Sequence, residues 1–133
     1  MSTIFDQELS DWDVSRVTTM RGLFSGTQVF KNLFTTDIGG WNVSRVEDMV
    51  DVFKDAVAFN TDISEWPIGN VQAFDNMLSG ATSFNHSLCA WGSIISKSAT
   101  VVDMFRNTGC PNQADPNLTA TPPGPFCFTC TAS

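Results

Sequence analysis

The stretch GWNVSRVEDM, residues 40–49, nearly repeats the stretch DWDVSRVTTM, residues 11–20. Tryptophan marks the repeat along the chain at intervals of 29, 25 and 25 residues: Trp12, Trp41, Trp66 and Trp91. Phenylalanine stands seven residues before each tryptophan: Phe5, Phe34, Phe59 and Phe84. The longer first interval places extra residues in GTQVFKNL, residues 26–33. A period near 25 residues is typical of units that bury their apolar faces by stacking on one another.

Each unit has the spacing of an extended piece followed by a helical piece. The tryptophan alternates with a Val or Ile two residues later, as in a strand, and a tight corner follows at the VSRV stretch. Beyond the corner, Val17, Met20, Leu23 and Phe24 stand at i, i+3, i+6 and i+7, which predicts a helix of about two turns. Gly26 follows this segment as a stop signal.

The sequence therefore predicts an α/β fold: a short right-handed solenoid of strand-plus-short-helix repeats, similar to a leucine-rich repeat. Residues 4–109 form its four rungs, and the Trp and Phe columns form its core. Residues 110–133 form an irregular C-terminal cap of the same domain, because five prolines between positions 111 and 125 exclude a regular helix or central strand. A Trp column could alternatively be a stacking platform for sugars, but a narrow stack requires a large aromatic core, which favours burial.

Composition limits the classes of partner. The 133 residues carry 14 acidic and 7 basic side chains, a formal charge of −7, and the pI is near 4.3. Such a field repels phosphate backbones and anionic lipids, so nucleic acid is not an expected partner. We expect no membrane insertion either, because no apolar run approaches the roughly 20 residues of a spanning helix. The chain also lacks a basic, apolar leader, so any export signal has been removed.

All four cysteines stand late in the chain, at Cys89, Cys110, Cys127 and Cys130. Their even number, with three Asn-x-Ser/Thr triplets, favours an oxidising compartment and two disulfides that staple the cap. A Cys127–Cys130 bond would constrain little, so we expect Cys89 and Cys110 each to pair with one of these two. A redox motif or half a zinc site is the weaker interpretation of the Cys-x-x-Cys spacing.

The stretches DIGGWNVSRVEDMVDVF, residues 37–53, and FNTDISEWPIGNVQAF, residues 59–74, resemble the 25-residue repeat of BspA-like bacterial surface proteins and mycoplasma surface lipoproteins. The resemblance covers residues 5–105, and the tail resembles the cysteine-bearing end of algal repeat proteins. It implies a secreted or cell-surface protein with a leucine-rich-repeat-like fold that binds other macromolecules. It implies no enzymatic activity and no cofactor. The stretch WPIGNV departs from the family pattern at one corner.

Two charged columns are the candidate binding residues. Arg16 and Arg45 follow the tryptophans by four residues, and an acidic column precedes them by four: Glu8, Asp37 and Asp62. The columns could form a mixed-charge recognition strip or could simply keep the surface soluble. The carboxylates could alternatively bind calcium, although capping of local turns is the plainer role of such residues. Three threonines at positions 35, 36 and 61 are too few for a regular ice-binding face.

These observations favour a non-enzymatic surface module that binds an unidentified protein or glycan. The alternatives are a structural spacer, or a fragment of a longer array, with no ligand of its own. A small enzyme or redox carrier has little support, because His86 is the single histidine. An uncapped N-terminal rung could self-associate. A specific partner would be recognised where the copies differ, at Asp13 against Asn42 and at Thr18-Thr19 against Glu47-Asp48.

Overall fold

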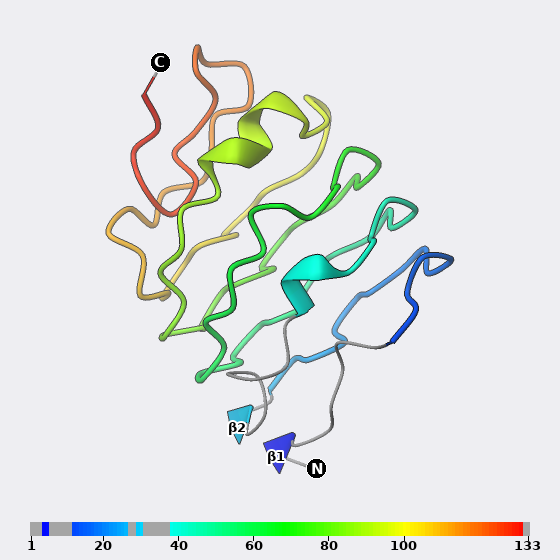
Figure 1. Ribbon diagram of the computed structural model, residues 1–133. Helices are drawn as coiled ribbons and strands as arrows, with labels where there is room; N and C mark the ends of the chain where they lie inside the picture. The colour runs from blue at the N-terminus through cyan, green and yellow to red at the C-terminus, as the bar shows by residue number, and fades with distance from the viewer. Residues whose placement is uncertain (1–3, 6–11, 27–28, 31–37, 132–133) are drawn as a thin grey trace.

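The computed structural model describes residues 4–5, 12–26, 29–30 and 38–131. Four successive units are stacked from the N-terminal end of the molecule to the C-terminal end, where the cap lies (Figure 1). Regular elements are few: the strands β1 (Ile4–Phe5) and β2 (Val29–Phe30), and the 3-10 helices η1 (Ile38–Gly40) and η2 (Cys89–Ser93). The described ranges contain no α-helix.

The predicted strand-plus-helix solenoid is therefore wrong. Left-handed backbone conformations interrupt each segment that was expected to be helical, ten and fourteen residues after the tryptophan in the first three units. In the first unit these residues are Gly22 (φ 68°) and Gly26 (φ 76°), and in the second they are Asp51 (φ 61°) and Asp55 (φ 58°). An L-residue with positive φ cannot continue a right-handed helix, so the chain forms successive turns instead.

These turns are joined from unit to unit by a regular ladder of backbone hydrogen bonds, which we call the turn ladder: residues 19–26, 48–55, 73–80 and 100–107. At each junction, four alternate N–H groups of one unit donate to carbonyls of the next, with N···O distances of 2.8–3.1 Å. In the first junction the donors are Met20, Gly22, Phe24 and Gly26. The spacing is that of a parallel β-ladder, and isolated parallel bridges run through it at Thr19, Asp48, Ala73 and Thr100.

The segments around the tryptophans are also not the strands that the alternation predicts. Gly40 ends η1 immediately before Trp41, and Trp91 lies within η2. The corner that follows is a hydrogen-bonded turn, in which Val46 N–H donates to the Val43 carbonyl at 3.0 Å. Asn42 Oδ1 accepts the Ser44 N–H at 3.1 Å, which is the side-chain turn that Asn and Asp favour.

The core is a set of aromatic columns along the stack. The rings of Trp12, Trp41 and Trp66 follow one another at 6.4 Å with interplanar angles of 6°, and Phe59 stacks on Phe84 at 5.8 Å. Trp41, Trp66, Trp91, Phe59 and Phe84 are buried. Trp12 is 50% exposed because it ends the Trp column, so the predicted burial of the whole column fails at this position.

The strand pair corrects the alignment of the first two units. β1 and β2 are parallel, with Ile4 opposite Val29 and Phe5 opposite Phe30. Phe30 rather than Phe34 therefore occupies the column of Phe5, and the extra residues of the first interval follow Phe30. Phe34 itself lies outside the described residues.

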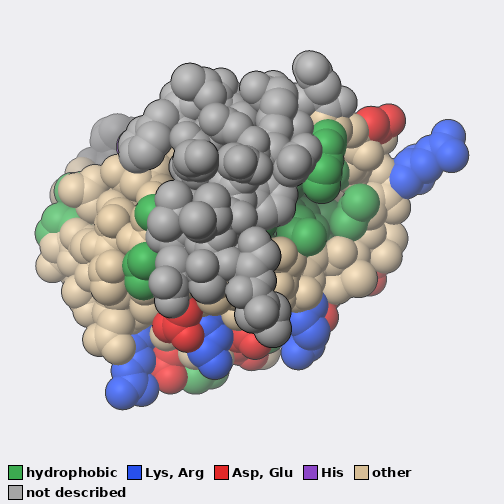
Figure 2. Space-filling view, turned by 90° about the horizontal axis from the view of Figure 1, so that it is seen from below, with side chains coloured by type: hydrophobic (Ala, Val, Ile, Leu, Met, Phe, Trp, Pro, Cys, Tyr) green, Lys and Arg blue, Asp and Glu red, His purple; other side chains and the backbone are tan. Residues whose placement is uncertain are grey.

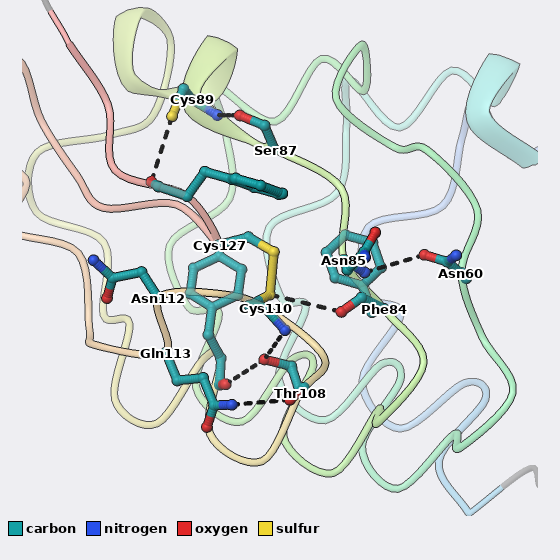
Figure 3. The surroundings of a disulfide bond; sticks show 12 residues. Asn60, Phe84, Asn85, Ser87, Cys89, Thr108, Cys110, Asn112, Gln113 and Cys127 are labelled. Carbon is teal, nitrogen blue, oxygen red and sulfur yellow. Dashed lines mark hydrogen bonds between the residues drawn. A yellow bond between two sulfur atoms is a disulfide. The ribbon is translucent and has the colours of Figure 1, made fainter.

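The cap is held on the fourth unit by both disulfides. Cys89 bonds to Cys130, and Cys110 bonds to Cys127, with sequence separations of 41 and 17 residues. The expected pairing of Cys89 and Cys110 with the two late cysteines is thus the one the structure has. Figure 3 shows the Cys110–Cys127 bond beside Phe84, where Cys110 Sγ lies 3.7 Å from the Phe84 carbonyl. Phe126 is fully buried in the same core cluster as the repeats.

Candidate functional site

An open polar depression of about 460 Å³ crosses the first three units. It lies just beyond the hydrogen-bonded corners, so equivalent positions of successive units line it side by side. The lining residues are Thr18, Arg45, Glu47, Asn70 and Gln72. Every one of these side chains is exposed, and each carries hydrogen-bonding groups. The arrangement suits a polar ligand that lies across the stack.

The floor of this depression is held in place by the stack itself. Asn70 Nδ2 donates to the Ser44 carbonyl at 2.7 Å, and Gln72 Nε2 donates to the Asn70 carbonyl at 3.2 Å. The backbone N–H of Glu47 donates to the Thr18 carbonyl at 2.8 Å. Among the described residues, neither the Arg45 guanidinium nor the Glu47 carboxylate is paired with another charged side chain. One charge of each sign is therefore available to a ligand.

A second, smaller depression of about 230 Å³ is lined by Gly39, Gly40, Asp62 and Glu65. Asp62 Oδ1 accepts the Ser64 N–H at 2.9 Å. This backbone hydrogen bond lowers the pKa of Asp62 below the ordinary carboxyl value, because it stabilises the charged form. The carboxylate thus closes a local turn, like Asp13, whose pKa is lowered mainly by the hydroxyl of Ser15.

The structure does not bring all the predicted binding residues together. Arg45 and Asp62 line different depressions, and Arg16 is exposed but lines neither. Glu8 and Asp37 lie outside the described residues. Column analysis of charges overlooked the polar members of the larger depression, although Thr18 and Glu47 belong to the positions that differ between copies. The available signal was that the +4 and +6 positions after the tryptophan are polar in the first three units.

The turn ladder carries charges of its own. Arg21 Nε donates to Asp48 Oδ2 at 2.8 Å across the first junction, and Asp75 accepts the Thr100 hydroxyl at 3.0 Å and the Val102 N–H at 2.8 Å across the third. Figure 2 shows basic and acidic side chains side by side along one edge of the molecule. These charges pair between units, so they contribute to stacking more directly than to recognition.

Two other chemical groups have local roles. His86 Nε2 lies 2.9 Å from the Asn60 carbonyl, and its ring meets the edge of Phe84 at 5.7 Å. All four cysteines are in disulfides. Within the ranges that the structure describes, no group of three or more His, Cys, Asp or Glu side chains is placed to hold a metal ion. In the same ranges, no helix has the length and apolar character needed to cross a bilayer.

Comparison with known proteins gives a family for the chain. The family model described as "Mycoplasma protein of unknown function, DUF285" matches residues 1–117, which include all four tryptophan units and the start of the cap. No curated protein matches the chain, and no solved structure does. The repeat, its aromatic columns and this match agree on one assignment: the chain belongs to the DUF285 family of Mycoplasma proteins of unknown function.

Proposed function

We propose that this protein is a non-enzymatic extracellular or cell-surface module that binds a protein or glycan partner across its stack. The depression lined by Arg45, Glu47 and their polar neighbours carries this proposal. An open surface with an unpaired charge of each sign and several amide groups can hydrogen-bond to hydroxyls or to peptide groups of a ligand. It has a wide, shallow form, which suits an extended partner better than a small molecule.

The surface location rests on two further observations. Two disulfides fasten the cap, and disulfides persist in oxidising surroundings outside the cytosol. The repeat also resembles BspA-like surface proteins, for which binding of other macromolecules is the implied role. The depression contributes no nucleophile paired with a base, so binding is the chemistry that its residues favour.

The test compares a double variant of the depression with a charge-matched control. Arg45→Ala/Glu47→Ala removes both charges of the site, whereas Lys97→Ala/Asp115→Ala removes one exposed charge of each sign elsewhere. Wild-type protein is applied to a glycan array and is cross-linked to surface proteins of the native cell. We expect the site variant to lose roughly tenfold or more in binding, because truncated central contacts cost over about 1 kcal/mol each.

The control variant should bind as the wild type does. If the site variant retained full binding, the partner would use another face, and the depression would lose its proposed role. If neither screen detected a partner for the wild-type protein, the module would be a spacer without a ligand of its own.

A further inference from the structure

The turn ladder ends in two complementary edges. At the fourth unit, the N–H groups that continue the donor columns belong to Val101, Asp103 and Phe105, and none of them has a partner among the described residues. At the first unit, the carbonyls that continue the acceptor columns are equally unpaired within the described ranges: Thr19, Arg21, Leu23 and Ser25. Both sets are spaced two residues apart, like the groups that join the units inside the molecule.

The cap leaves most of the donor edge open. We expected the cap to cover this edge, but its one direct contact with the donors is at Asn107, whose N–H donates to Gln113 Oε1 at 3.1 Å. Gln113 Nε2 in turn donates to the Thr108 carbonyl at 2.9 Å. The cap instead packs its buried Phe126 on the aromatic core. Val102, between two of the free donors, is 57% exposed.

We propose that a second copy of this chain docks its first-unit carbonyl edge on the fourth-unit donor edge, so that copies associate head to tail. The register is already defined, because each of the three internal junctions joins the same columns through four hydrogen bonds. Three of those four bonds can form between copies, since Gln113 occupies the fourth donor. Leu23, 46% exposed at the free first unit, would then continue the column of the buried Met104.

Hydrogen-bond chemistry makes this association directional. Two donor edges cannot pair with each other in this register, and two acceptor edges cannot either. The contact is heterologous, so it extends into longer assemblies as concentration rises. Each hydrogen bond contributes only modestly to association, so we expect the assembly to be weak and reversible. It uses the ladder edges rather than the polar depression, so it does not depend on the proposed binding function.

Sedimentation velocity from micromolar to millimolar protein tests this inference with two edge variants. Val102→Lys places a charge on the donor edge, and Leu23→Lys places one on the acceptor edge, where edge lysines discourage strand pairing. We expect wild type to form a concentration-dependent series of oligomers and each variant to remain monomeric. An equimolar mixture of the two should form one-to-one dimers and nothing longer, because each variant retains one intact edge. Val57→Lys, at an exposed position outside the edges, should associate like wild type.

Other outcomes would overturn the proposal. Wild type that stayed monomeric at millimolar concentration would do so, as would a mixture that formed no dimers. Association of Val102→Lys alone would indicate pairing of two first units instead.

Gln113→Ala provides a test that does not depend on the edge lysines folding well. It frees the fourth donor at Asn107, so we expect association to strengthen roughly 2- to 10-fold, the effect of one added hydrogen bond. Unchanged association in this variant would contradict the proposed edge.

Discussion

At the scale of single residues, Trp66 shows how a repeat position becomes core. Its ring stacks 6.4 Å from Trp41 and lies 6.1 Å from Phe53, and it is fully buried. Its indole Nε1–H donates to the Ile38 carbonyl of the preceding unit at 2.8 Å, and Trp91 makes the equivalent bond to Ile63 at 3.2 Å. The tryptophan thus satisfies its one polar group inside the core while it joins two units.

We expect Trp66→Ala to lower the free energy of unfolding by about 3–5 kcal/mol, because it leaves a cavity and an unpaired Ile38 carbonyl. Trp12→Ala, in the same column, should cost about 1 kcal/mol, since half of that ring is already in water. Urea denaturation of both variants measures the difference. Equal losses at the two positions would mean that burial does not set the contribution of this column.

At the scale of elements, the repeat and its core were predictable but the backbone conformation was not. Apolar residues at i, i+3, i+6 and i+7 return to one side in a helix, and they do so equally in a chain that turns every four residues. The discriminating signal was a second column of Gly, Asn and Asp, the residues that tolerate positive φ. Its members are Gly22, Asp51, Asn76 and Asp103. Periodicity of the apolar residues alone cannot show this column.

The candidate site was predictable only in part for a related reason. Arg45 was identified from its column, but the depression around it depends on how three corners align, which the ladder register determines. Asn70 and Gln72 carry no charge, so an analysis of charged columns passed over them. Their roles follow from geometry, because the amide of Asn70 bridges to the Ser44 carbonyl of the preceding unit.

The left-handed column makes a direct prediction at Asn76, whose φ is 56°. Its N–H donates to the Val102 carbonyl at 2.9 Å, so the position is needed for the third junction. We expect Asn76→Val to lower the free energy of unfolding by about 1–3 kcal/mol, because a β-branched residue is strained at positive φ. Asn76→Gly should change it by less than about 0.5 kcal/mol, since glycine adopts this conformation freely.

Chemical denaturation of the two variants, read by circular dichroism, checks the result. A valine variant as stable as the glycine variant would show that the left-handed turn at Asn76 is not required by the ladder.

At the scale of the whole molecule, the stack and the cap share one core. Phe126 and Leu118 of the cap are buried in the cluster that also contains Trp66 and Phe53. The Leu88 N–H donates to the Phe126 carbonyl at 3.1 Å, so the backbone also connects the cap to the fourth unit. We therefore expect residues 110–133 to unfold together with the repeats, as parts of the same domain.

Removal of one disulfide tests this expectation. In the chain-entropy account, a loop of 41 residues closed by Cys89–Cys130 contributes about 4 kcal/mol, and a loop of 17 residues closed by Cys110–Cys127 contributes about 3 kcal/mol. The double variant Cys89→Ala/Cys130→Ala should lose stability of this order in a single transition. Hydrogen exchange should show the cap amide of Asn117, bonded to the Gly124 carbonyl, and the ladder amide of Phe53 losing protection together. If Asn117 lost protection while Phe53 kept it, the cap would be a separate cooperative unit, held to the stack mainly by its covalent bonds.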